Sequence, residues 1–378
     1  MTPRPNRGSG VNRIPRRSKV TTKTLVFVFI VALAASAGAQ PATIFSDGFE
    51  LGDTSGWNNE TPWLQTEGNK IWTGGGAVWH GRGANIHDTR SCWACSWAPP
   101  NVDEVKRRID TLVDDWNAGF LRLLLESYPD NSGGQVQWQG VLDDPDYLQS
   151  LVEIVEHIGT KPGVYVMVSL WADPTFSDLG WPTADTIAVW ERLAETFAGY
   201  PHVIYGLVNE PEENWNGALD EACWTAMNDT VAAIRAVETA IGAHNHVIAV
   251  QGTRAWARVL DYYITHPITA GGGVNIAYET HVYNPASDFD ALFVTPSQTL
   301  PVIVGEFGVV SGMTAEDCGL LMDQAEALQI PYTAWTFHMR CPPNLIEDSS
   351  GGGCGVGMDL TPTSWGVQLR DQLDGGSP

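Results

Sequence analysis

Two glutamates of this sequence could work as a pair of catalytic carboxyl groups. Glu210 follows the apolar stretch at 203–208, and Glu306 lies inside the apolar stretch at 302–308. Such a pair can cleave a glycosidic bond, because a protonated carboxyl donates to the leaving oxygen while an ionised one attacks the anomeric carbon or activates a water. Direct attack needs carboxyl groups about 5–5.5 Å apart, and attack by water needs about 6.5–9.5 Å. The pair therefore predicts hydrolysis, with a stereochemical outcome that depends on this distance.

Further polar and aromatic side chains stand at or near the ends of other apolar stretches. They are His87, Asp88, Arg122, Trp171, Asn209, His281, Tyr283, Trp335 and His338. A single residue of this kind is most often a solvated rim residue or is satisfied locally. Together with the two glutamates, the set indicates one functional edge, provided that the fold gathers the ends of these stretches.

The elements that would position these residues alternate regularly along the chain. Apolar, strand-like runs lie at 77–86, 120–128, 163–171, 202–210, 246–252, 274–283, 300–310 and 332–339. Helical segments lie at 101–119, 145–158, 183–199, 217–241, 314–328 and 363–374, with a short one after the fifth run. Eight strand-like runs that alternate with helical segments predict an α/β fold, the closed (β/α)8 or TIM barrel, whose catalytic groups stand at the carboxyl ends of its strands.

The alternative fold is a doubly wound open sheet. A sheet of that kind that binds a nucleotide carries a glycine-rich phosphate loop after one of its strands. No such loop follows any of the eight runs. We therefore expect the closed barrel, and we expect no cofactor.

The beginning of the chain is typical of an exported protein. Residues 1–24 hold seven basic side chains and no acid, and residues 25–37 form an apolar run that is short for a bilayer span. We expect residues 1–39 to be a cleaved signal peptide, with an uncleaved membrane anchor as the alternative. Residues 40–76 would form an N-terminal linker or short strand segment, and 77–378 the catalytic domain of a secreted, extracellular or periplasmic protein.

The acidic balance of the chain restricts its partners. The formal net charge is −23, and removal of the predicted signal peptide, with its seven basic residues, would leave −30. A chain this acidic is not expected to bind nucleic acid, whose phosphates would repel it. A neutral polysaccharide or oligosaccharide is compatible, because some of the 16 tryptophans could stack on the apolar face of a sugar ring. No later run resembles a membrane span, so no membrane contact is expected after signal cleavage.

The cysteines indicate disulfide bonds. Six follow the predicted signal peptide: Cys92, Cys95, Cys223, Cys318, Cys341 and Cys354. An even number in an exported chain favours disulfides, although six cysteines allow 15 pairings. We expect bonds within or between the loop at 85–97 and the loop after the eighth run. A redox-active Cys-x-x-Cys at 92–95 is the alternative.

Four short motifs hold many of the polar residues at the strand ends. They are GLVNEP at 206–211, THVYNP at 280–285, VIVGEFG at 302–308 and AWTF at 334–337. In combination they resemble glycoside hydrolase family 5, the cellulase-like family of the clan A retaining glycosidases. The resemblance covers the predicted barrel, residues 77–374, and its specificity lies in the pairing of Asn-Glu-Pro after the fourth strand with Glu-Phe-Gly after the seventh.

The resemblance implies a role for each carboxyl group. Glu210 would be the general acid/base, and Glu306 would be the nucleophile of a double displacement that retains the anomeric configuration. Arg122 would lie beneath Glu306 and help to keep it ionised, and Tyr283 would hydrogen-bond the nucleophile. Different neighbours should push the pKa values of the acid and the nucleophile apart, up for the acid and down for the nucleophile.

The same resemblance implies the contacts with the sugar at the cleavage point. Asn209 would bind the 2-hydroxyl group, His281 would line the subsite, and Trp335 would form its stacking floor. All three residues belong to the four motifs that carry the resemblance.

The chain departs from the family pattern at the end of the third strand. The family commonly has a histidine there, whereas this chain has Ser169 and Trp171. The sugar contacts on that side are therefore expected to differ, with Trp171 as the candidate. His87 and Asp88 could also face the cleft, or they could belong to a disulfide-tied loop that does not touch substrate.

We therefore expect a secreted retaining hydrolase of a β-1,4-linked polysaccharide, similar to an endoglucanase. A β-mannanase or another β-glycan hydrolase of the same family is the nearest alternative. A catalytically silent carbohydrate-binding barrel is an alternative of a different class, which the presence of Asn209, Tyr283 and Arg122 beside both glutamates disfavours. A metal-dependent barrel would need clustered ligands such as His-x-His after the first strand. The stretch at 79–88 lacks that spacing, so no metal is expected.

Overall fold

The structure is a computed structural model of the chain. It describes residues 61–89, 101–125, 128–129, 135–136, 140–170, 180–211, 214–349 and 356–375, which belong to a compact unit that spans residues 54–378. The predicted signal peptide, residues 40–60 and the candidates Cys92, Cys95, Trp171 and Cys354 lie outside the described residues. No helix among the described residues combines the length and the apolar character needed to cross a bilayer.

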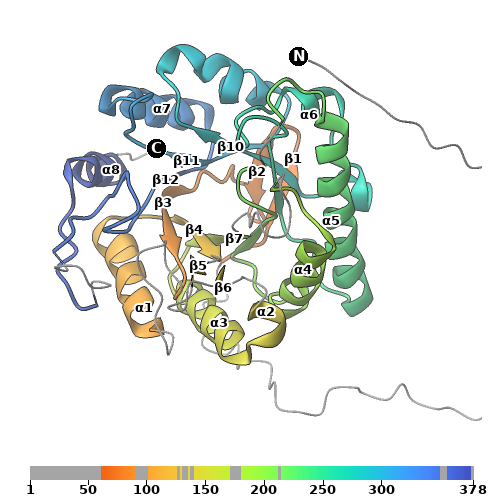
Figure 1. Cartoon of the computed structure of the whole chain (residues 1–378), viewed down its shortest axis with the longest axis horizontal. Coiled ribbons are helices and arrows are strands. Elements are labelled where there is room, and N and C mark those ends of the chain that lie inside the picture. The colour runs from red at the N-terminus through yellow and green to blue at the C-terminus, as the bar shows by residue number, and fades with distance from the viewer. Residues whose placement is uncertain are drawn as a thin grey trace, which may run out of the picture. The chain divides into compact units, whose positions relative to one another are not determined.

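Eight parallel strands form a closed barrel at the centre of this unit (Figure 1). In chain order they are β3 (Arg82–His87), β4 (Phe120–Leu125), β7 (Tyr165–Leu170), β8 (Val203–Gly206), β9 (Ile248–Gln251), β10 (Ile276–Val282), β11 (Val302–Phe307) and β12 (Tyr332–Ala334). The last strand pairs with the first, so the barrel sheet is closed. The predicted (β/α)8 barrel is confirmed, and the open-sheet alternative is wrong.

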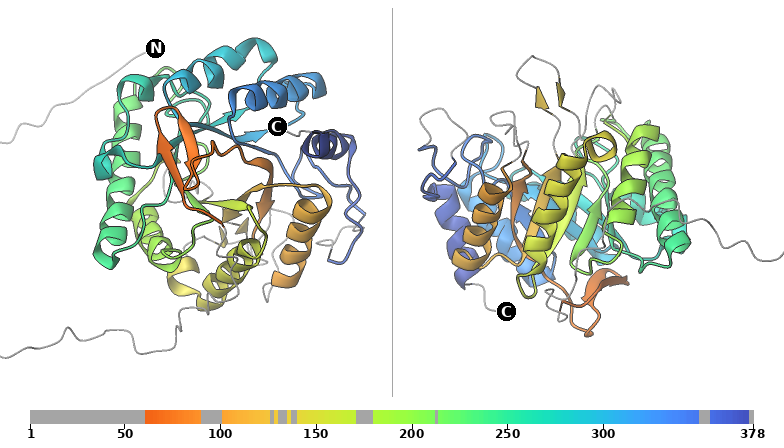
Figure 2. Two further views of the ribbon diagram at one scale, coloured as in Figure 1. Left: turned by 180° about the vertical axis from the view of Figure 1, so that it is seen from behind. Right: turned by 90° about the horizontal axis from the view of Figure 1, so that it is seen from below.

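Helices surround the barrel and connect its strands (Figure 2). They are α1 (Val102–Asp110), which continues as a π-helical turn at Thr111–Asp115, α2 (Gly140–Asp143), α3 (Pro145–Gly159), α4 (Ala184–Thr196), α5 (Asp220–Ile241), α6 (Asp261–Thr265), α7 (Ala315–Leu328) and α8 (Ser364–Gly375). Asp144, Thr183 and Thr314 cap the first turns of α3, α4 and α7, because each side chain accepts a hydrogen bond from a main-chain N–H there. Three short helical turns at Ala286–Asp288, Asp290–Val294 and Pro296–Gln298 connect β10 to β11, where the sequence indicated no helix.

The strands are continuous apolar runs because both of their faces are buried. In β7, Tyr165 and Met167 belong to the cluster inside the barrel, whereas Val166, Val168 and Leu170 belong to the larger cluster beneath the helices. Every second side chain of a strand therefore points into the barrel. A polar residue on that face near the carboxyl end of one strand meets the corresponding residues of the other strands.

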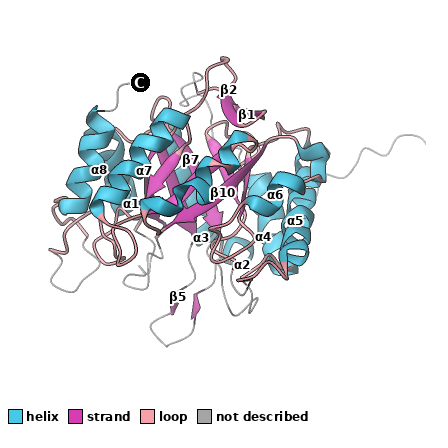
Figure 3. Cartoon of the chain, turned by 90° about the horizontal axis from the view of Figure 1, so that it is seen from above, coloured by secondary structure: helices cyan, strands magenta, loops and turns pink. Residues whose placement is uncertain are grey.

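Two small antiparallel hairpins lie outside the barrel sheet. They are β1 (Leu64–Glu67) with β2 (Lys70–Thr73), and β5 (Tyr128–Pro129) with β6 (Gln135–Val136). Figure 3 shows the two hairpins at opposite ends of the barrel. Leu64 and Ile71 of the first hairpin join the cluster inside the barrel, so this hairpin closes the amino-terminal end. The second hairpin follows β4 and marks the carboxyl end, where the predicted site residues should lie.

Candidate active site

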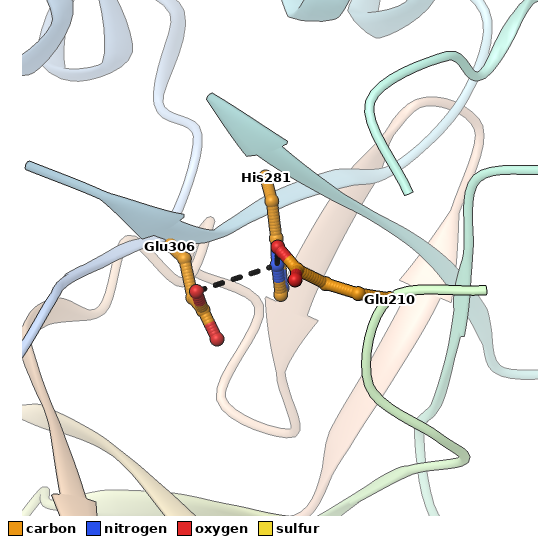
Figure 4. A group of neighbouring side chains, drawn as sticks. All are labelled: Glu210, His281 and Glu306. Atoms are coloured by element: carbon orange, nitrogen blue, oxygen red, sulfur yellow. Dashed lines mark hydrogen bonds and ion pairs between the residues drawn. The ribbon is translucent and has the colours of Figure 1, made fainter. Parts of the chain in front are cut away.

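The two glutamates that were predicted as a pair lie close together at the carboxyl end of the barrel. Glu210 follows β8, and Glu306 lies near the end of β11. A carboxylate oxygen of each and a ring nitrogen of His281 all lie within 4.8 Å of one another. Figure 4 shows the imidazole of His281 between the two carboxylates. These three side chains form the centre of the candidate site.

A β-bulge in β11 directs Glu306 into the barrel. Up to Val304, β11 pairs residue by residue with β10, but the next pair joins His281 to Glu306, so Gly305 is an extra residue. Ile303 belongs to the cluster inside the barrel, and strict alternation from it would place Glu306 on the helix side. The bulge therefore reverses the direction of this one side chain.

The main chain at Glu210 has a left-handed conformation, with φ of 51°. A residue with a side chain adopts this conformation at a cost of about 1–3 kcal/mol. The N–H of Glu210 donates to Oε1 of Gln251, the last residue of β9, and this bond holds the strained turn. The Glu210 side chain is 27% exposed, against 5% for Glu306, so Glu210 is the more accessible carboxyl group.

Arg122 is completely buried and contacts both sides of the site. Its guanidinium lies near Oε1 of Glu306 (2.8 Å), Oδ1 of Asn209 (2.8 Å), Oδ1 of Asn85 (3.0 Å), Oγ of Ser169 (3.2 Å) and, through Nε, Oε1 of Glu279 (2.8 Å). The two carboxylates compensate the charge of the guanidinium, and the three neutral groups fix its plane. Arg122 therefore lies against Glu306, at the place that the resemblance implies for it.

His281 contacts three carboxylates. Its Nδ1 lies 2.9 Å from Glu210 and 3.5 Å from Glu306, and its Nε2 lies 3.1 Å from Glu279. Burial lowers the pKa of His281, but the three carboxylates outweigh burial and raise the pKa to about 9. Near neutral pH the imidazole therefore carries a proton on each nitrogen and donates hydrogen bonds in both directions.

The carboxylate–imidazole–carboxylate group has donor atoms that could hold a cation. A histidine binds a metal ion through an uncharged ring nitrogen. His281 is protonated near neutral pH because its pKa is raised to about 9, and its N–H groups are directed at carboxylates. The group therefore fits a hydrogen-bonded set of side chains better than a metal site.

The electrostatics of Glu306 differ from the prediction of a lowered pKa. Burial and the negative charge of Glu210 raise the pKa of Glu306, whereas the positive charges of His281 and Arg122 lower it. The result is a pKa raised to about 7. The hydroxyl of Tyr283 donates to the Oε2 atom, 3.0 Å away, and opposes the rise. The negative charge of Glu210 is one of the causes of the raised pKa, so the ionisation of Glu306 depends on its partner in the pair.

Trp335 and His87 lie beside the carboxylate pair. Trp335 packs with Leu124 and Tyr283, and its ring meets that of His87 edge-on at 5.4 Å. Nε2 of His87 lies 3.0 Å from the hydroxyl of Thr336. Burial holds the pKa of His87 well below its usual range, so this imidazole is uncharged. His87, which was predicted to face the cleft, therefore contacts Trp335.

Asp88 and His338 are buried in the wall of the barrel. Oδ2 of Asp88 accepts a hydrogen bond from the hydroxyl of Tyr147 on α3. Nδ1 of His338 accepts one from the main-chain N–H of Arg340, 3.0 Å away. Both residues therefore help to hold neighbouring segments in place.

Three residues of the site were not singled out from the sequence, namely Asn85, Gln251 and Glu279. Glu279 lies two residues before His281, on the same face of β10, and Gln251 ends β9. The alternation of strand side chains could have indicated both. Asn85 lies within an apolar run and donates from Nδ2 to the carbonyl of Gly305, 2.9 Å away. No local pattern signals that contact, because the two residues lie far apart in the sequence.

Two loops at the carboxyl end of the barrel are joined beside the site. Asp220, which begins α5, accepts hydrogen bonds at 2.9 Å from Nε of Arg254, which follows β9. The same loops carry Trp215, which is 59% exposed, and Trp256, whose ring lies 4.6 Å from that of Trp215 at an angle of 86°. The ion pair thus joins the two loops that carry exposed Trp215 and half-buried Trp256.

Known proteins resemble the chain in sequence and in fold. The family model for cellulase (glycosyl hydrolase family 5) matches residues 78–340. Endoglucanase 1 of Ruminococcus albus is 25% identical over 284 residues, which cover 65% of this chain and 67% of that protein. Endoglucanase CelA of Streptomyces lividans is 24% identical over 246 residues. These residues cover 61% of this chain and 48% of that protein.

Solved structures share the barrel. The crystal structure of a β-glucanase from Saccharophagus degradans superposes with a TM-score of 0.66 at 21% identity, covering 85% of this chain and 96% of that one. The same β-glucanase in complex with cellotetraose superposes with a TM-score of 0.65 at 20% identity, with the same coverage. At this level of identity the likeness shows the fold.

Proposed function

We propose that this chain, which belongs to glycoside hydrolase family 5, hydrolyses β-1,4-linked glucan as an endoglucanase-like enzyme and retains the anomeric configuration. Its family makes it a glycoside hydrolase. The observation that carries the finer proposal is the approach of the Glu210 and Glu306 carboxylates, with an oxygen of each within 4.8 Å. This fits the separation of about 5–5.5 Å in retaining enzymes and is too short for the 6.5–9.5 Å of inverting ones.

The proposed reaction consists of two displacements. In the first, ionised Glu306 attacks the anomeric carbon, the bond to the leaving oxygen breaks, and Glu210 transfers its proton to that oxygen. In the second, Glu210 takes a proton from a water whose oxygen attacks the anomeric carbon and releases Glu306 as a carboxylate. Two inversions leave the configuration unchanged, and Glu210 regains the proton that it donated.

We assign the attack to Glu306 because its carboxylate accepts hydrogen bonds on both oxygens. Arg122 donates to Oε1 and Tyr283 to Oε2, and bonds to the ionised form favour that form. Glu210 is the more exposed of the two, so its proton can reach a leaving oxygen. In this assignment Glu210 is the general acid of the first displacement.

The sugar contacts are proposed from the same geometry. Oδ1 of Asn209 accepts from Arg122, 2.8 Å away, so Nδ2 would bind the 2-hydroxyl group. His281 would line that subsite. Trp335 is 6% exposed, so a sugar would rest on only part of its ring, and His87 would support this floor from the side.

An extended polysaccharide is the proposed substrate. Trp215 and Trp256 present aromatic surface at the rim, where the apolar faces of successive sugar rings could stack. Relatives of the chain are named endoglucanases, and the β-glucanase from Saccharophagus degradans binds cellotetraose. These observations favour β-1,4-glucan over mannan.

Export and disulfide formation are also proposed. Residues 1–39 would be the signal peptide, residues 40–76 a linker or short strand segment, and 77–378 the secreted catalytic domain. Cys223 and Cys318 are buried free thiols, so any disulfide joins cysteines of the loops after the first and eighth barrel strands, namely Cys92, Cys95, Cys341 and Cys354. Peptide mapping without reduction tests this pairing, and a bond to either buried thiol would reject it.

Activity of the purified chain on soluble β-1,4-glucan, cellulose, β-mannan and xylan tests the substrate. We expect cleavage of β-1,4-glucan and a first product with the β configuration by proton NMR. Cleavage of mannan alone would transfer the proposal to a β-mannanase. Binding of a glycan with no cleavage of any would support the silent barrel.

Assays with an aryl cellobioside that has a good leaving group test which glutamate is the nucleophile and which is the acid/base. Glu306→Ala should abolish hydrolysis, and added azide should restore it with an α-glycosyl azide as product. Glu210→Ala should keep most of the first displacement, because this leaving group needs no proton, although a general acid is worth about 10²–10⁴-fold on poor leaving groups. Azide should then give a β-glycosyl azide. Glu316→Ala, at an exposed position of α7, is the control. Undiminished hydrolysis by Glu306→Ala would reject the mechanism.

A further inference from the structure

Glu279, the third carboxylate of the site, takes no part in the two proposed displacements. It lies in β10 with its side chain fully buried. Its Oε1 meets two cations, Nε of Arg122 at 2.8 Å and Nε2 of His281 at 3.1 Å. Burial of a carboxylate is unfavourable unless its neighbours compensate the charge, so packing alone does not account for a glutamate here.

Two cations of the site face three carboxyl groups, of which those of Glu279 and Glu306 are buried and that of Glu210 is partly exposed. Arg122 and protonated His281 provide two positive charges. If Glu279, Glu306 and Glu210 were all ionised, they would provide three negative charges. Burial raises the pKa of Glu279, but its two cations outweigh burial and hold the pKa below the usual value. Ionised Glu279 therefore offsets one of the two positive charges, and one remains to act on Glu306 and Glu210.

We propose that Glu279 is a positioning residue that holds Arg122 and His281 beside the catalytic pair and offsets one of their two positive charges, because its carboxylate contacts both cations. The inference rests on the proposed roles of Glu210 and Glu306. Without the Glu279 charge, the two cations would act on the catalytic carboxyl groups with their full charge.

The bulge residue Gly305 provides the space for this carboxylate. A Cβ atom at position 305 would lie 1.9 Å from Oε1 of Glu279, and the next two atoms that it would meet, at 2.7 and 2.8 Å, also belong to Glu279. The residue that turns Glu306 into the barrel therefore also leaves the room that Glu279 fills. One local irregularity of β11 thus places the nucleophile and the compensating carboxylate together.

The surroundings of Glu279 decide how the site responds to its removal. The groups that face it are Arg122 of β4, Gln251 of β9, His281 of β10 and Gly305 of β11. Of these groups, Arg122 and His281 are charged, and both are cations that contact Oε1 of Glu279. Removal of its negative charge makes the site more positive, so every group that titrates there should lose its proton at a lower pH.

The pH profile of kcat/KM for Glu279→Gln tests the proposal, since the two limbs report the essential acid and base of the free enzyme. Both limbs should move by about 1–2 pH units toward acid, as expected for loss of one charge a few ångströms away. Thr280→Val is the control, because this uncharged neighbour donates to the carbonyl of Arg258, at 3.1 Å, and its replacement should leave both limbs in place. A loss of activity in Glu279→Gln with unmoved limbs would show a merely structural role and overturn the proposal.

A double-mutant cycle tests the close approach of Gly305 and Glu279 through stability alone, without an activity assay. Gly305→Ala should lower the thermal midpoint by about 3–8 °C in the unaltered chain, because the added methyl group overpacks against Glu279. In a Glu279→Ala background the same change should have little effect, since the methyl group then enters vacated space. Equal losses in the two backgrounds would overturn the proposed packing.

An NMR titration of the His281 ring separates this inference from the proposed function. His281 should titrate near pH 9 in the unaltered chain and at least about one unit lower in Glu279→Gln. If the chain cleaves no glycan but the shift is observed, the proposed function fails and the charge balance stands. If glucan is cleaved and His281 does not shift, the proposed function stands and this inference fails.

Discussion

Replacement of Arg122 by methionine tests whether compensated charge holds the site together. The guanidinium lies 2.8 Å from both Glu279 and Glu306, and its side chain is fully buried. Methionine fills part of the apolar volume but leaves two buried carboxylates without their shared cation. Loss of one partner of a buried ion pair costs about 3–5 kcal/mol. We therefore expect the free energy of unfolding at pH 7 to fall by at least about that amount.

The loss should become smaller as the pH falls. In the unaltered chain the pKa of Glu279 lies below the 4.5 of an unperturbed glutamate, so its ionisation stabilises the fold above about pH 4.5. Without Arg122, burial raises the pKa of Glu279 above its unfolded-state value, and ionisation then opposes folding above that pH. The difference between the two chains should be largest near neutral pH and should narrow toward pH 4.5.

Urea unfolding at pH 7 and pH 4.5, followed by tryptophan fluorescence, measures both effects. Arg82→Met is the matched control, because the ion pair of Arg82 with Glu326, at 3.0 Å, is about one-fifth exposed on both sides and is worth about 1 kcal/mol or less. Two results would refute the reasoning: equal losses for the two variants, or a loss for Arg122→Met that is as large at pH 4.5 as at pH 7.

Three further outcomes are expected. Trp215→Ala should lower kcat/KM on long cello-oligosaccharides by roughly 3–10-fold while sparing a short aryl glycoside, as loss of one stacking contact predicts; equal effects on both substrates would contradict a binding role. Tyr283→Phe removes a donor that lowers the pKa of Glu306, so the acidic limb of kcat/KM should move to higher pH; an unmoved limb would count against it. Gly366→Ala should cost about 1–3 kcal/mol in urea unfolding, because its methyl group would lie 1.9 Å from a main-chain carbonyl oxygen, whereas Gly375→Ala on the same helix meets nothing within 4 Å and should be nearly neutral.

The barrel could be predicted from the sequence because its signals are local. Each strand is a short apolar run bounded by polar or turn-forming residues, and eight such runs alternate with helical segments. The same locality made Glu210 and Glu306 visible, since each glutamate interrupts or ends an apolar run. Their approach depends on contacts between β8, β10 and β11, which no single run contains.

The rest of the site depends on long-range geometry. In the sequence, Glu279 is one residue within an apolar strand. Its role becomes visible only in the fold, where β4 places Arg122 beside it. The register shift at Gly305 has no signature beyond a glycine that any strand could carry. The raised pKa of Glu306 differs from the expected direction because burial outweighs the arginine, and burial cannot be read from the neighbours of Glu306 in the sequence.

The hairpin formed by β1 and β2 also constrains the order in which the chain can fold. It precedes every barrel strand in the sequence, yet the N–H of Thr66 bonds to Oδ1 of Asn275, 209 residues later. Leu64 packs in the same interior cluster as Ile303 of β11. Pairing between segments so far apart is slow, because loop-closure entropy opposes it before any contact forms. The barrel sheet closes only when β3, its first strand, pairs with β12, its last. The native interior can therefore be completed only when nearly the whole chain is available.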